Sequence, residues 1–185
     1  MRLFVGIPLA PVVIEELTKL TDRLHAQDDR LHWSAPETWH VTLQFLGSTD
    51  QQQYDCIVPR LHEIHHPRVP VRLESTGFFD HAGIFFADVK SAPALLILQQ
   101  AIIAATTPCG FATESRAYHP HITLARSKGK DAAQSLRQLK SRLGIPMKFS
   151  PFLADEFLLY ESFTEPAGSR YEIRARFPLG SLLSG

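Results

Sequence analysis

The segment HVTLQFLG, residues 40–47, shares the pattern histidine, any residue, threonine, leucine with HITLAR, residues 121–126. Side chains of a β-strand alternate between its two faces. His40 and Thr42 are therefore predicted on one face of a strand, with apolar residues on the other. His121 and Thr123 occupy the same places in the second copy. Two such strands, related by a pseudo-two-fold axis, would bring two imidazoles and two hydroxyls into one cleft.

Strict alternation also assigns a face to the residues that follow each tetrad. Phe45 falls on the apolar face, so we expect it in the core and not against a base. Arg126 falls on the face opposite His121, although a bend at the strand end could turn it toward the cleft. Arginine suits bidentate contact with phosphate. Arg126 is therefore a candidate for substrate contact, with a surface salt bridge as the alternative.

Length and charge limit the classes of function. The 185 residues suit one domain, residues 1–185, built as two lobes that share a core. With 19 Lys and Arg against 19 Asp and Glu, the chain carries no net charge, which argues against extended non-specific binding to a polyanion. A small anionic group held in a pocket remains compatible with this balance.

The location predicted from the sequence is the cytoplasm. Cys56 and Cys109 form neither a metal-ligand nor a disulfide pattern, which fits a reducing compartment. The apolar stretch 3–13 is interrupted by two prolines, so we interpret it as a buried strand and not as an export signal. No stretch reaches the ~20 apolar residues that a membrane helix needs. Nothing in the sequence indicates an obligate protein partner.

Apolar periodicity predicts a mixture of helices and strands without regular alternation, which favours an α+β fold. The order strand, helix, motif strand, helix occurs twice, which predicts two pseudo-symmetric lobes of antiparallel sheet and helices around a central cleft. A polar, turn-like segment is expected at 27–36. The expected helices are residues 11–24, 51–61, 91–110 and 132–143. The expected strands are residues 3–7, 40–47, 69–79, 83–89, 121–126, 147–153, 156–161 and 171–177.

Two opposed imidazoles suit displacement at phosphorus. With an unperturbed pKa near ~6.5, one histidine can accept a proton while the other donates one. Thr42 and Thr123 would donate hydrogen bonds to non-bridging phosphate oxygens, and no metal or cofactor is required. Two alternatives remain: a purely structural role for these strands, and a zinc site at His119 and His121.

The paired tetrads, with FLG after the first and Pro-His before the second, resemble the two-histidine (2H) phosphoesterase superfamily. The opening RLFVGIPL and the late LYES are similar to its RNA 2′,3′-cyclic phosphodiesterases, also described as 2′-5′ RNA ligases. The resemblance implies a bilobal fold and metal-independent hydrolysis of the 2′,3′-cyclic phosphate end of an RNA or oligonucleotide to a 2′-phosphomonoester. It makes His40 the proton donor, His121 the proton acceptor, and Thr42, Thr123 and Arg126 the phosphate-binding residues. The residues themselves leave the opposite assignment of donor and acceptor open.

Two rival functions follow from the same residues. The reverse reaction would join RNA ends through a 2′-5′ linkage, and a nucleotide-binding module would keep the cleft without catalysis. Residues 126–148 hold seven basic side chains and one acid, either as a rim that steers RNA or as a solvated helix face. Tyr118 and His119 are candidates for contact with a base or ribose.

Overall fold

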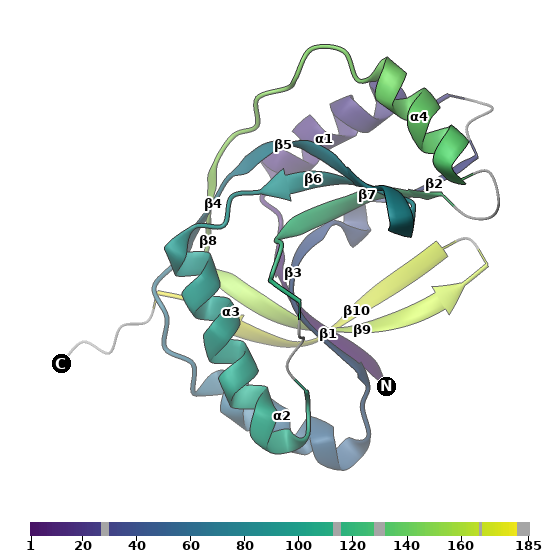
Figure 1. Ribbon diagram of the computed structural model, residues 1–185. Coiled ribbons are helices and arrows are strands. Elements are labelled where there is room, and N and C mark those ends of the chain that lie inside the picture. Colours follow the sequence, from purple (N-terminus) through teal and green to yellow (C-terminus); the bar gives the residue numbers. More distant parts are fainter. Residues whose placement is uncertain (27–29, 113–115, 128–131, 167, 181–185) are drawn as a thin grey trace.

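The computed structural model describes residues 1–26, 30–112, 116–127, 132–166 and 168–180 (Figure 1). Within them the chain forms two four-stranded antiparallel sheets, a two-stranded sheet and four α-helices, which confirms the α+β class. The first sheet has the order β10 (Gly168–Pro178), β9 (Glu156–Glu165), β1 (Arg2–Pro8), β3 (His40–Ser48). The second has the order β2 (Leu31–Trp33), β7 (His121–Ser127), β6 (Ile84–Val89), β5 (Leu73–Phe79). Each four-stranded sheet therefore contains one of the two motif strands.

The helices cover the two ends of the molecule. Figure 1 shows α1 (Pro11–Leu24) and α4 (Ala132–Arg142) beside the second sheet, and α2 (Gln51–His62) and α3 (Pro93–Thr106) together at the other end. The side chains of α1 buried in the core are those of the predicted stripe: Val13, Leu17, Leu20 and Leu24. This apolar stripe at helical spacing fixes the helix against the sheets. In the part of the chain that the model covers, no helix combines the length and apolar character needed to span a membrane.

Three predicted elements differ from the structure. A short strand, β2, lies inside the segment expected to be a polar turn, and its pairing with β7 explains why it forms. The predicted strand 69–79 is divided into β4 (Val69–Val71), which pairs with β8 (Phe152–Ala154), and β5, which pairs with β6. The predicted strand 147–153 is correspondingly reduced to β8. All three differences depend on which strands pair with each other, and the local sequence pattern carries no information about this pairing.

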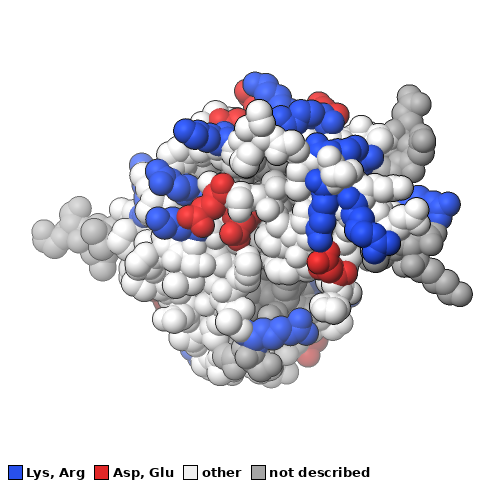
Figure 2. Space-filling model, turned by 45° about the horizontal axis from the view of Figure 1, so that its top comes forward, with Lys and Arg blue, Asp and Glu red and all other residues white. Residues whose placement is uncertain are grey.

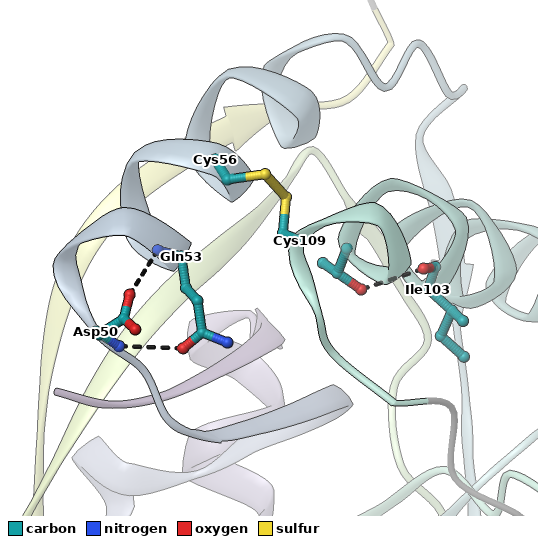
Figure 3. Close-up of a disulfide and its surroundings, with 6 residues drawn as sticks. Asp50, Gln53, Cys56, Ile103 and Cys109 are labelled. Atoms are coloured by element: carbon teal, nitrogen blue, oxygen red, sulfur yellow. Dashed lines mark hydrogen bonds between the residues drawn. A yellow bond between two sulfur atoms is a disulfide. The ribbon is translucent and has the colours of Figure 1, made fainter.

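The expectation for the two cysteines is wrong. Cys56 of α2 and Cys109 of the 3₁₀ helix η3 (Thr107–Cys109) form a disulfide with 5.8 Å between their Cα atoms (Figure 3). The packing of α2 against α3 brings them together across 53 residues of sequence. A cross-link closing a loop of this length stabilises the fold by about 4 kcal/mol in the chain-entropy model. The cysteine content therefore no longer supports a reducing compartment.

Candidate functional site

The two motif strands share one pattern of exposure. From His40 in β3 and from His121 in β7, seven successive residues are half-buried, buried, half-buried, buried, buried, exposed and buried. Two consecutive buried residues break the strand alternation in both. The cause is a β-bulge, because Leu43 and Leu124 have no partner in the ladders to β1 and β6. The two strands therefore resemble each other in irregularity as well as in sequence.

After the bulge, each residue points to the strand face opposite to the one that strict alternation predicts, up to the next register shift in the ladder. Phe45, predicted in the core, is 60% exposed, and its ring lies 6.1 Å from that of Phe4, which stacks on His40. Gln44 takes the buried position instead, at 6% exposure. The prediction for Phe45 is therefore wrong, because strict alternation does not hold across a bulge.

Arg126 is the counterpart of Phe45 in the second strand. It is exposed, and its charge acts on His121, lowering the pKa of that imidazole. Alternation placed Arg126 on the face opposite His121, which is wrong for the same reason as for Phe45. The bulge at Leu124, and not a bend at the end of the strand, turns it. Contact between Arg126 and substrate stays a prediction.

His40 is enclosed by aromatic rings. Phe4 stacks on it at a centroid distance of 4.6 Å, Tyr171 meets it edge-on at 5.3 Å, and Tyr160 lies at 5.7 Å. Its Nδ1–H donates to the carbonyl of Thr38 (2.8 Å), and its Nε2 lies 3.0 Å from the Thr42 hydroxyl, which donates to the neutral ring. Burial lowers the pKa of His40 to about 4; the bond to Thr38 opposes this, and the charge of His121 adds to it.

His121 also lies against two aromatic rings, those of Phe79 (5.1 Å) and Phe86 (5.4 Å), and it has charged and polar neighbours in addition. Its Nδ1–H donates to the carbonyl of His119 (2.7 Å), and Asp88 stands opposite it in the ladder between β6 and β7. Burial is the main cause that lowers the pKa of His121, with the charges of His119 and Arg126 acting in the same direction. The bond to the His119 carbonyl and the charge of Asp88 act against it. Both imidazoles are therefore predominantly neutral near pH 7.

The two rings are held in the same tautomer. In each, Nδ1–H is bonded to a carbonyl two residues earlier in the chain, so Nε2 is the nitrogen that exchanges protons. Neither histidine titrates independently, because the charge of His121 acts on His40. The arrangement thus provides two imidazoles with Nε2 available for acid–base chemistry, each with a threonine on the same strand face.

Tyr118 and His119, candidates for base or ribose contact, each have a protein partner, and their contact with a base or ribose stays a prediction. The Tyr118 hydroxyl donates to the carbonyl of Thr42 (2.8 Å), and His119 Nε2 pairs with Asp88 (2.8 Å). The zinc alternative finds no support, since the described residues include no group of three or more His, Cys, Asp or Glu side chains suited to a metal. The ring of His119 is held by Asp88 instead.

The described residues include only part of the proposed basic rim. Lys128, Lys130 and Asp131 of the segment 126–148 lie outside the described residues. Lys140 pairs with Asp80 at 2.8 Å. On the face drawn in Figure 2, Lys and Arg side chains form several groups with acidic side chains among them, not one continuous strip. The choice between a steering rim and a solvated helix face therefore stays open.

Sequence patterns did not reveal the residues that enclose His40. Phe4, Tyr160 and Tyr171 come from three strands whose order in the sheet could not be predicted. Gly6 is the residue near His40 that the local sequence could have indicated, since a glycine inside a strand often marks a place where another group approaches the backbone closely. A Cβ at Gly6 would lie 3.0 Å from the Val41 carbonyl oxygen and 3.2 Å from His40 Cδ2. The absence of a side chain there lets His40 pack against the sheet.

Comparison with known proteins supports the same family as the motifs. The family model described as the 2′-5′ RNA ligase superfamily matches residues 7–161. A Geobacillus stearothermophilus protein named RNA 2′,3′-cyclic phosphodiesterase is 26% identical over 181 residues, which cover 95% of this chain and 56% of that protein. A Thermotoga maritima protein of the same name is 25% identical over 181 residues, 94% of this chain and 92% of its own length. This chain thus spans little more than half of the first relative and nearly all of the second.

Solved structures share the fold. Escherichia coli LigT in its apo form superposes with a TM-score of 0.80 at 23% identity, covering 96% of both chains. The Thermus thermophilus protein TT0787 gives a TM-score of 0.75 at 22% identity over 96% of this chain and 97% of its own. At this level of identity the similarity concerns the arrangement of strands and helices.

Proposed function

This chain belongs to the 2′-5′ RNA ligase superfamily, and from that membership we propose that it hydrolyses the 2′,3′-cyclic phosphate at the end of an RNA to a 2′-phosphomonoester. The observation that carries the proposal is the pair of equivalent bulged strands, each presenting an imidazole whose Nδ1 is bonded to a carbonyl, which leaves Nε2 as the nitrogen that exchanges protons. The name of the two relatives, RNA 2′,3′-cyclic phosphodiesterase, supports the choice of substrate. Residues 1–185 act in this proposal as one domain.

The proposed reaction is an in-line displacement by water. The water oxygen forms a bond to phosphorus while the bond between phosphorus and the ribose 3′ oxygen breaks. His121 accepts the proton of the attacking water through Nε2, and His40 donates a proton to the departing 3′ oxygen. Thr42, Thr123 and Arg126 bind the non-bridging oxygens, where negative charge is concentrated. The chemistry proposed here uses only these side chains.

The low pKa of His40 has consequences for its role as donor. At pH 7 a group with a pKa near 4 is protonated in roughly one molecule in a thousand. The anionic phosphate of a bound substrate favours the imidazolium and raises this fraction. The Thr42 hydroxyl, which donates to His40 Nε2, must turn to the phosphate and so release that nitrogen. Once protonated, a group of low pKa is a strong acid for the 3′ oxygen.

The opposite assignment has one observation in its favour. Asp88 raises the proton affinity of His121, as suits a proton donor. His40, with the lower pKa, would then act as the base toward water. We keep His40 as donor because of the family resemblance.

Phe45 is proposed as the platform for the terminal base. It is 60% exposed on the strand face that carries His40 and Thr42, and RNA-binding proteins commonly stack single-stranded bases on such aromatic rings. This extends the site from the phosphate to the nucleoside. The cytoplasm is kept as the proposed location on the basis of the proposed RNA substrate alone, because the disulfide does not support it.

The reverse reaction remains the second candidate. The same two histidines exchange roles when a 5′-hydroxyl, in place of water, attacks the cyclic phosphate. Water is present in large excess over any RNA end, so hydrolysis is expected to dominate. A 5′-hydroxyl RNA added in excess provides the test, because a 2′-5′ linked product would appear only if ligation competes.

The experiment that tests the proposed function uses a short RNA with a 2′,3′-cyclic phosphate, incubated with the protein in excess EDTA. Mass spectrometry and nuclease mapping identify the product. A 2′-phosphomonoester formed by the wild type and lost in His40→Ala and His121→Ala is the expected result. Saturable protection of the RNA end without turnover would instead identify a nucleotide-binding module and contradict catalysis.

A further inference from the structure

One side chain connects the segment before the second motif to the strand of the first. Tyr118, three residues before His121, donates its hydroxyl hydrogen to the carbonyl of Thr42 at 2.8 Å. Thr42 directly precedes Leu43, the bulge residue of β3. The bond therefore ties the segment that leads into β7 to β3, one residue before the bulge.

The two bulges are supported by different means. In β7 the carbonyl of Leu124 accepts from the backbone N–H of Ser34 (2.8 Å), which directly follows β2, the strand that pairs with β7. β3 lies at the edge of its sheet and has only β1 as a neighbour. Carbonyls on the open side of an edge strand lack a strand partner. In β3 the Tyr118 hydroxyl instead donates to the carbonyl of Thr42, one residue before the bulge, on this edge strand.

The contacts continue from Tyr118 into the proposed acid–base pair. On one side, the hydroxyl of Thr42 bonds to His40 Nε2. On the other, the residue after Tyr118 is His119, whose carbonyl holds His121 Nδ1. Burial raises the pKa of Tyr118, so its hydroxyl remains a hydrogen-bond donor throughout the working range of pH. The bond is therefore a link of fixed polarity between the two histidine strands.

We propose that Tyr118 is a positioning residue that, through the Thr42 carbonyl, sets the place of His40 and Thr42 relative to His121. The proposal rests on the proposed function, because positioning matters only if the two histidines act on one phosphate. Tyr118 itself does not touch the reacting atoms. Since catalysis depends on geometry within about 1 Å, loss of this single bond reduces turnover more than it reduces binding.

The test compares Tyr118→Phe with Tyr54→Phe, which removes the hydroxyl of a half-buried tyrosine on α2, outside both motif strands. Tyr118→Phe is expected to lower kcat about 10- to 100-fold with a much smaller change in KM, since the reacting groups are misplaced while the binding groups remain. Tyr54→Phe is expected to leave both constants unchanged. Thermal unfolding of both variants shows whether each is folded at the assay temperature.

A second measurement does not depend on activity. The pKa of His40 is followed by NMR titration in the wild type and in Tyr118→Phe. Loss of the bond loosens β3 at Thr42 and admits water, so the pKa of His40 is expected to rise from about 4 toward its usual value. The groups that act on His40, the Thr38 carbonyl and His121, are the same in both proteins.

The outcomes separate the possibilities. Unchanged kcat and unchanged His40 titration in Tyr118→Phe would overturn the proposal. A lower kcat with unchanged titration would assign the hydroxyl to direct substrate contact and would also overturn it. If the wild type turned over no cyclic phosphate, the proposed function would fail, whereas the His40 titration would still decide whether Tyr118 positions that histidine.

Discussion

β3 and β7 have the same backbone design and different surroundings. Both carry a histidine, a threonine and a bulge in the same register, and both fix the imidazole through Nδ1. Both imidazoles have aromatic neighbours: Phe4, Tyr160 and Tyr171 around His40, and Phe79 and Phe86 around His121. The difference is that the charges of Asp88, His119 and Arg126 also act on His121. The backbone thus sets the geometry of the two walls, and their neighbours set the proton affinity of each.

This difference lets one repeated motif serve two purposes. The residue that the bulge turns outward is aromatic in β3, where it can meet a base, and cationic in β7, where it can meet a phosphate. Phe45 and Arg126 therefore differ in chemistry at equivalent places. If both motif strands are required but act differently, substitutions in either strand should lower activity, and the effects should differ in kind.

The largest effect is expected from the histidines. His40→Ala and His121→Ala should each lower kcat about 10²- to 10⁴-fold, because each removes one proton transfer. His65→Ala, at an exposed position outside the motif strands, serves as control and should be fully active. Full activity of His40→Ala or of His121→Ala would contradict the account, which requires both histidines for catalysis.

The same variants sharpen the comparison with a second substrate. A phosphodiester with a 4-nitrophenolate leaving group does not need a proton donor. The variant of the donor should therefore regain activity on it, and the variant of the base should not. With His40 as donor, His40→Ala is the one that recovers, and recovery by His121→Ala would reverse the assignment.

A smaller effect is expected from Arg126. Replacing it with alanine removes charged hydrogen bonds worth about 1.5–3 kcal/mol, so kcat/KM should fall roughly 10- to 100-fold. Arg126→Lys should recover only part of this, because lysine keeps the charge without the bidentate fork. Steady-state kinetics on the cyclic phosphate give both values. If Arg126→Ala were fully active, Arg126 would not contact the substrate, and the alternative of a surface salt bridge would hold.

The smallest effect is expected from Phe45. Stacking of a base on an aromatic ring contributes about 1 kcal/mol at the lower end of its usual range. Phe45→Ala should therefore raise KM roughly fivefold for a nucleoside cyclic phosphate. Phe45→Trp should not. A cyclic phosphate without a base provides the comparison, since its KM should be the same for wild type and variant. An equal effect on both substrates would show that Phe45 does not contact the base.

Alternation along the strands was sufficient to predict the shared face of His40 with Thr42 and of His121 with Thr123. It failed at Phe45 and Arg126, because a bulge depends on the neighbouring strand and leaves no local signal in the sequence. The aromatic enclosure of His40 and the disulfide were missed for a related reason. Both join residues from elements whose packing is decided by the whole fold and not by local pattern.

The pH dependence of kcat/KM tests most directly whether these two histidines are the acid and the base. One must be protonated and the other neutral, and the pKa of each is lowered, that of His40 to about 4. Whichever is the donor, kcat/KM should therefore reach its maximum above pH 4 and below the usual pKa of histidine, about 6.5, and should fall about tenfold per unit of pH above 6.5. A kcat/KM that stays constant or rises from about pH 6.5 to about 8.5 would contradict the assignment of the reaction to this histidine pair.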